Sequence, residues 1–90
     1  MSKAVVDPAE LRRFALDLKR FVAAVEAQMN VMNGRMQALS QTWRDQEQAK
    51  FAEQFDTTMK TLARFSTTAN EHVPFLLRKA EKIEEYLNQH

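Results

Sequence analysis

The sequence predicts an all-α protein, an antiparallel hairpin of two long helices that dimerises into a four-helix bundle. Apolar residues recur at steps of three and four along two long segments, and the chain contains only one glycine and two prolines. A short turn signal lies near the middle. The 90 residues make one domain, in which we expect a first helix over about 8–42, a turn over 43–45 and a second helix over about 46–88.

The first helix is expected to begin at a strong start signal and to continue as an apolar stripe. Asp7 suits the N-cap, Pro8 the first helical position and Glu10 the third position of a capping box. Asn33-Gly34 is a turn signal elsewhere, but the stripe crosses it in phase, so we expect a continuous helix there, with a kink as the alternative. The stripe consists of Leu11, Phe14, Leu18, Phe21, Val25, Met29, Met32, Met36, Leu39 and Trp43.

The turn is predicted from the residues around the only tryptophan. Asp45 and Gln48 have capping-box spacing, in which the aspartate accepts from the next turn and the glutamine reaches back, so a helix should start at Gln46. A link this short brings two helices side by side and antiparallel. Trp43, Arg44 and Asp45 then form the tip, as candidates for both the turn and partner recognition. Trp43 either closes the end of the bundle or anchors a partner.

The second helix is expected to carry a similar stripe with one weak point. Residues 66–68 are poor helix formers, and Pro74 lacks the amide hydrogen that an interior helical position uses. Because the stripe keeps its phase across them, we expect one helix with a bend near residues 70–74 rather than two helices. The members of this stripe that we assign to the core or to a dimer interface are Phe51, Phe55, Met59, Leu62, Phe65, Leu76 and Ile83.

Both stripes are too wide for one hairpin to bury. Phe75 and Leu77 flank Leu76, for example, and a lone hairpin of this size would expose more contiguous apolar surface than a soluble monomer tolerates. Pairing with a second hairpin, either another copy or a different chain, would cover that surface. We therefore also assign the stripe residues from Leu11 to Leu39 to the core or to a dimer interface.

The composition argues against most chemical functions. Without cysteine the chain can form neither disulfides nor thiolate metal sites, and a net charge of +1 with interleaved signs gives no reason to expect nucleic acid as a partner. His72 has no second metal-ligating residue at helical spacing, and Gly34 alone cannot form a phosphate-binding loop. We expect no enzyme activity, no cofactor and no metal. No signal peptide or membrane-spanning segment is visible, so we expect no stable membrane insertion.

The tip carries a family likeness. Trp43 lies between two long helical segments of a chain of this length, Phe51 and Phe55 follow one and two turns into the second segment, and Asp45 stands where a Trp-x-Gly motif has glycine. Across nearly its whole length the chain thus resembles the WXG family, the early-secreted-antigen-like proteins of type VII secretion systems. The resemblance implies a homodimeric or heterodimeric four-helix bundle that is recognised by a membrane-associated secretion ATPase.

The resemblance also implies a function and a location. We expect a non-catalytic protein that acts through dimerisation and partner binding, secreted without a cleavable signal peptide or cytoplasmic before export. Many members or their partners carry a C-terminal Tyr-x-x-x-Asp/Glu export signal, whereas here Tyr86 is followed four residues on by His90. The alternative is a cytoplasmic structural or adaptor hairpin, such as a chaperone for a larger protein. A membrane-active helix pair is a third hypothesis, which the near-neutral charge disfavours.

Overall fold

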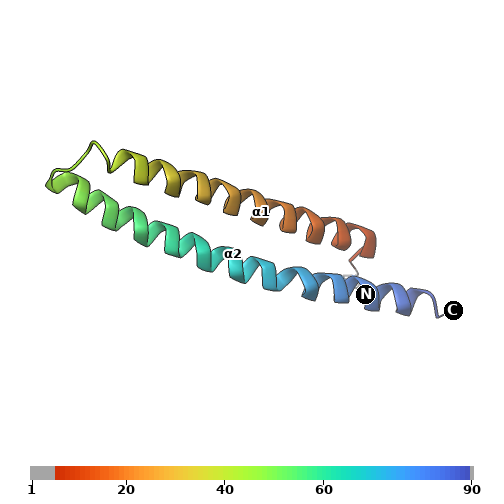
Figure 1. Cartoon of the computed structure of the whole chain (residues 1–90). Helices are drawn as coiled ribbons and strands as arrows, with labels where there is room; N and C mark the ends of the chain where they lie inside the picture. The colour runs from red at the N-terminus through yellow and green to blue at the C-terminus, as the bar shows by residue number, and fades with distance from the viewer. Residues whose placement is uncertain (1–5, 90) are drawn as a thin grey trace.

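The computed structural model describes residues 6–89, which form two helices, α1 (Pro8–Leu39) and α2 (Gln46–Leu87) (Figure 1). The helices lie side by side and antiparallel, joined at one end by residues 40–45, and α2 extends beyond the start of α1 at the other end. The hairpin is a rod of 69 × 22 × 15 Å. Its radius of gyration is 20.3 Å, against about 12 Å for a compact domain of this length. The predicted all-α hairpin is confirmed.

Each helix starts behind an aspartate cap. The carboxylate of Asp7 accepts a hydrogen bond of 2.9 Å from the backbone amide two residues on, and Pro8 occupies the first turn. The carboxylate of Asp45 accepts one of 3.0 Å from the amide of Gln48. The side chain of Gln48 does not reach back to the cap residue, as the capping box predicted. Its Nε2 instead donates to the hydroxyl of Ser40 at 3.0 Å. This bond ties the start of α2 to the end of α1.

The first helix ends at Leu39, three residues before the expected boundary at residue 42, so the turn spans 40–45 rather than 43–45. The amide and the hydroxyl of Ser40 both donate to the carbonyl of Met36, each at 3.0 Å. The amides of Gln41 and Thr42 donate to carbonyls three residues back, which is the tighter winding of a 3₁₀ turn. Serine and threonine side chains can bond to backbone groups and so compete with helical hydrogen bonds. The pattern of apolar residues does not show where such competition ends a helix.

The second helix runs through Pro74 without interruption. Proline has no amide hydrogen, so the carbonyl of Asn70 cannot receive the usual bond from four residues on. A helix of this length loses one backbone hydrogen bond at the proline and keeps the hydrogen bonds on either side, so it continues without a break. The bend near residues 70–74 stays a prediction.

The side chains that are buried between the helices are small or of moderate size. Small residues let two helix axes approach closely, and they fill the space between the axes without distortion. None of them belongs to the set that the sequence analysis assigned to the core or the dimer interface, since that set favoured large side chains. The residues buried in the described part of the chain are Ala15, Val22, Ser66, Ala69, Val73 and Ala80.

A predicted stabilising substitution follows from the environment of Gly34. The helix passes this glycine without interruption, its φ is not positive, and an added Cβ would meet no atom within 4 Å. Gly34→Ala should raise the free energy of unfolding by about 1 kcal/mol, the difference in helix propensity. That corresponds to a rise in Tm of roughly 4–8 °C for a domain of this size, measurable by circular dichroism. A fall in Tm would show instead that something packs tightly against this face in solution.

Candidate functional site

The tip of the hairpin is organised around Trp43. Its amide donates to the carbonyl of Leu39 at 2.9 Å, which folds the chain back at the end of α1. Its half-buried ring lies 5.9 Å from that of Phe51, with 35° between the planes, and Phe51 stacks on Phe55 at 6.2 Å. The tryptophan therefore joins the turn to the first turns of α2 and keeps part of its surface open to solvent.

The other two tip residues predicted for partner recognition are exposed. Arg44 donates from Nε to the carbonyl of Gln41 at 3.1 Å, within the turn. Asp45 has φ of −89° and caps α2, and no residue in the described chain has a positive φ. The turn thus has no need of the conformational freedom of glycine at position 45, and aspartate supplies a side-chain hydrogen-bond acceptor that glycine lacks.

The residues predicted for the core or the dimer interface remain wholly or partly open to solvent. Large side chains in a folded core normally lose most of their accessible surface. Because these residues keep much of theirs in a single hairpin, they are available for contact with another molecule. The exposed ones are Phe14, Phe21, Met32, Leu39, Phe51 and Phe65. The half-buried ones are Leu11, Leu18, Val25, Met29, Met36, Phe55, Met59, Leu62, Leu76 and Ile83.

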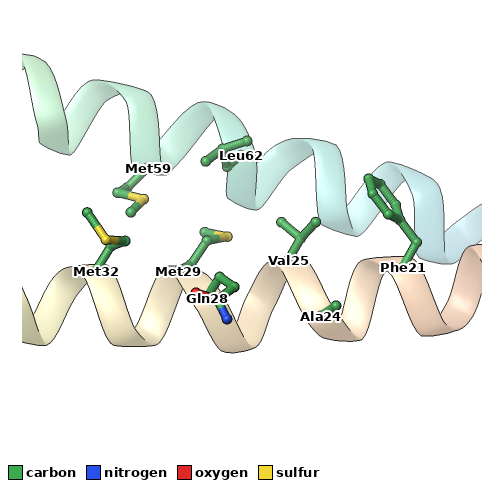
Figure 2. Close-up of a pocket in the computed structure, with 8 residues that line it drawn as sticks. All are labelled: Phe21, Ala24, Val25, Gln28, Met29, Met32, Met59 and Leu62. Atoms are coloured by element: carbon green, nitrogen blue, oxygen red, sulfur yellow. The ribbon is translucent and has the colours of Figure 1, made fainter.

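Ten of these residues come together as one surface, which we call the apolar strip. It contains a hollow of about 300 Å³ near the middle of the rod, where Figure 2 shows side chains of both helices converging. A second hollow of about 150 Å³ lies nearer the tip. Met32 lines both, so the two hollows are neighbours, and we refer to them together as the groove. The apolar strip consists of Phe21, Val25, Met29, Met32, Met36, Leu39, Phe51, Phe55, Met59 and Leu62.

The remaining members of the predicted set lie towards the open end and do not line this groove. The ring of Phe65 meets that of Phe21 edge-on at 6.2 Å, across the two helices. Ile83 lines a separate hollow with Lys79 and Lys82. The predicted residues follow one regular spacing in the sequence. In the structure, however, ten of them line the groove and the other six lie towards the open end of the hairpin.

A salt bridge joins the two helices at the open end. Nε of Arg12 donates to Oε2 of Glu84 at 3.0 Å, and a second bond runs from Nη2 to Oε1. The hydrogen bond from Arg12 lowers the pKa of Glu84. A lowered folded-state pKa means that the pair stabilises the hairpin above the unfolded pKa of Glu84 and loses this effect as the pH falls through the folded one. Both side chains are partly exposed, so the contribution is small.

The set that the sequence analysis assigned to the core or the dimer interface left out the buried small residues, although a signal for part of them exists. Ala15 and Val22 are seven residues apart and continue the spacing of Met29, Met36 and Trp43, which is the heptad spacing of a helix–helix contact. The sequence of one helix does not show whether this row of residues or the adjacent row faces the other helix.

Residues 6–89 can also be considered for groups that could hold a metal ion and for membrane-spanning stretches. In this part of the chain no cluster of three or more histidine, cysteine, aspartate or glutamate side chains could hold a metal ion. Within the same range, neither helix has a stretch long and apolar enough to span a bilayer. His72 is exposed.

Comparison with known proteins identifies relatives of the whole hairpin. The WXG100 family, described as proteins of 100 residues with WXG, matches residues 4–86. The chain is similar to the secreted protein EsxB from Bacillus anthracis strain Sterne. Its selenomethionine-labelled structure has a TM-score of 0.80 at 25% identity, over 98% of this chain and 100% of that one. The structure of a point mutant of the same protein has a TM-score of 0.77 at 26% identity, over 100% of this chain and 99% of that one. No curated protein sequence matches significantly.

Proposed function

The chain belongs to the WXG100 family, and from this membership we propose that it is a non-catalytic component of a type VII secretion system that acts by pairing with another helical hairpin. The observation that carries the proposal is the exposed groove along the apolar strip, on a hairpin similar over its whole length to a secreted protein. Burying exposed apolar side chains is the main driving force of protein association. A hairpin that offers such a strip is suited to binding, and another helical pair fits its length.

The tip supplies a second surface in this proposal. Trp43 is half-buried and Arg44 is exposed beside it, and tryptophan and arginine are the residues most enriched at the energetic centres of interfaces. The tip is separate from the middle of the groove, so a paired hairpin could still present it to a third protein such as a secretion ATPase.

Export of this chain requires its own test, because the expected C-terminal signal is incomplete. Tyr86 lies on the last turn of α2, and His90, which replaces the acidic residue of that signal, lies outside the described residues. The expected result is that the tagged chain appears in the culture supernatant of cells with an intact secretion ATPase and stays inside cells that lack it. A cytoplasmic marker protein, absent from both supernatants, controls for lysis.

Two results would contradict the export proposal. Equal amounts in both supernatants would show a route independent of the ATPase. Retention inside both cell types would favour the alternative function, a cytoplasmic adaptor or chaperone for a larger protein. In that case, co-purification from the cell lysate with a larger exported protein would be the next expectation to check.

A further inference from the structure

We propose that the larger hollow of the groove is a site of methionine oxidation, at which a peroxide converts Met29, Met32 and Met59 into methionine sulfoxides and so makes the hollow unfit to bind an apolar surface. The consequence of the modification rests on the proposed function, in which another hairpin binds the groove. The oxidation itself does not depend on that function. Three features support the inference: where the methionines lie, how exposed they are, and which polar groups surround them.

The methionines of the described chain all line the groove. The sequence has no cysteine and five methionines, of which Met1 lies outside the described residues. The larger hollow is lined by Met29, Met32 and Met59. The smaller hollow is lined by Met36 and again by Met32. Figure 2 shows the three side chains of the larger hollow turned towards the space between the two helices. The thioether groups of the described chain are therefore concentrated on one surface.

These side chains can be reached from solvent in a single hairpin. Met32 is 45% exposed, and Met29 and Met59 are half-buried. A peroxide must touch a sulfur atom to oxidise it, so the exposure of a methionine governs how fast it reacts. We expect Met32 to be oxidised first and the other two methionines of the larger hollow more slowly.

The reaction needs only a peroxide, such as hydrogen peroxide. A lone pair of the thioether sulfur attacks one oxygen of the peroxide, so that a sulfur–oxygen bond forms and the oxygen–oxygen bond breaks. The proton of the transferred hydroxyl passes to the departing hydroxide, which leaves as water. The sulfur loses two electrons and the peroxide gains them. The product is a sulfoxide, which reductases specific for methionine sulfoxide convert back to methionine.

A sulfoxide changes the character of the larger hollow. Its oxygen is a hydrogen-bond acceptor, whereas the side chains around the hollow are apolar except for Gln28 (Figure 2). When an apolar partner covers the hollow, most sulfoxide oxygens would lose their hydration without gaining a donor, which is unfavourable. The smaller hollow differs, because Arg35 lines it together with Met32 and Met36 and has several N–H donors. Sulfoxides in the larger hollow are therefore the ones that should prevent apolar contact.

The first measurement follows the oxidation of the purified full-length chain by hydrogen peroxide, with tandem mass spectrometry of its tryptic peptides. The same chain unfolded in guanidinium chloride gives the reference rate for each methionine. Met32 should react in the folded chain within about tenfold of its rate in the unfolded chain, and Met29 and Met59 should also be modified. Stronger protection of Met32 would show that its sulfur is covered and would overturn the proposal.

The second measurement uses Nile red, a neutral dye that fluoresces in apolar surroundings, as a probe of the groove. Peroxide treatment of the wild-type chain should lower the fluorescence of bound dye by about half, and reduction of the sulfoxides should restore it. A triple variant with leucine in place of Met29, Met32 and Met59 keeps apolar side chains of similar volume and should not respond to peroxide. Met36→Leu is the matched control and should respond as the wild type does.

Circular dichroism separates loss of folding from loss of dye binding. If the triple variant loses its helices, Met32→Leu alone takes its place and should respond to peroxide less than the wild type. Both proteins keep Met1 and Trp43. An equal response of a folded leucine variant and the wild type would therefore place the effect outside the larger hollow and overturn the proposal. Unchanged dye binding by the fully oxidised wild-type chain would overturn it as well.

The remaining outcomes separate this inference from the proposed function. A chain that is oxidised as expected but binds neither a second copy nor a co-encoded helical hairpin would overturn the proposed function and leave the modification site standing. A chain that binds another hairpin but keeps its methionines protected would overturn the modification site and leave the proposed function standing.

Discussion

Val22→Asp should abolish the folded hairpin. Val22 is 0% exposed, between the two helices, and a carboxylate there would lose its hydration with no cation among the buried residues, which are apolar except for Ser66. We expect a loss of about 3–5 kcal/mol, similar to the whole stability of a small domain. Far-ultraviolet circular dichroism of the variant at 25 °C should show most of the helical signal gone.

The matched control for this substitution is Ala23→Asp. Ala23 is the next residue on the same helix and is exposed, so its substitution changes helix propensity and little else. It should cost about 0.5–0.7 kcal/mol and leave a cooperative thermal transition. If Val22→Asp melted at the same temperature as Ala23→Asp, Val22 could not lie in the contact between the helices.

Trp43→Ala should destabilise the hairpin by about 2 kcal/mol. Replacing a fully buried tryptophan costs about 3–5 kcal/mol, and Trp43 is half-buried, so about half of that cost is expected. The substitution removes the ring that contacts Phe51 and keeps the hydrogen bond from the backbone amide of residue 43 to the carbonyl of Leu39. Urea unfolding followed by circular dichroism should show a lower midpoint with an unchanged slope.

The adjacent substitution Arg44→Ala separates the two roles considered for the tip. Arg44 is exposed and bonds only within the turn, so this variant should unfold within about 0.5 kcal/mol of the wild type. A stability loss confined to Trp43→Ala identifies the tryptophan as the residue that closes the turn. Unchanged stability together with lost partner binding would instead identify it as an anchor for a partner.

The signals that the sequence carries most clearly are local ones. A cap involves an aspartate and an amide two or three residues away, so Asp7 and Asp45 could be recognised without any tertiary information. The phase of the apolar stripe likewise passes through Gly34 and Pro74, and both helices are continuous there. Each of these features depends on residues within one or two helical turns, and the family likeness depends on the same local pattern around Trp43.

The two helices, their first residues and their antiparallel arrangement can therefore be predicted from local patterns. The row of apolar residues that faces the neighbouring helix depends on how the two helices pack together. Ala15 and Ala80 lie in that contact because it requires small side chains between close axes, and small residues are weak signals in a stripe of larger ones. Arg12 and Glu84 are far apart in the sequence and meet through the relative position of the helices. That position depends on all contacts between the helices together, so no single stretch of the chain contains it.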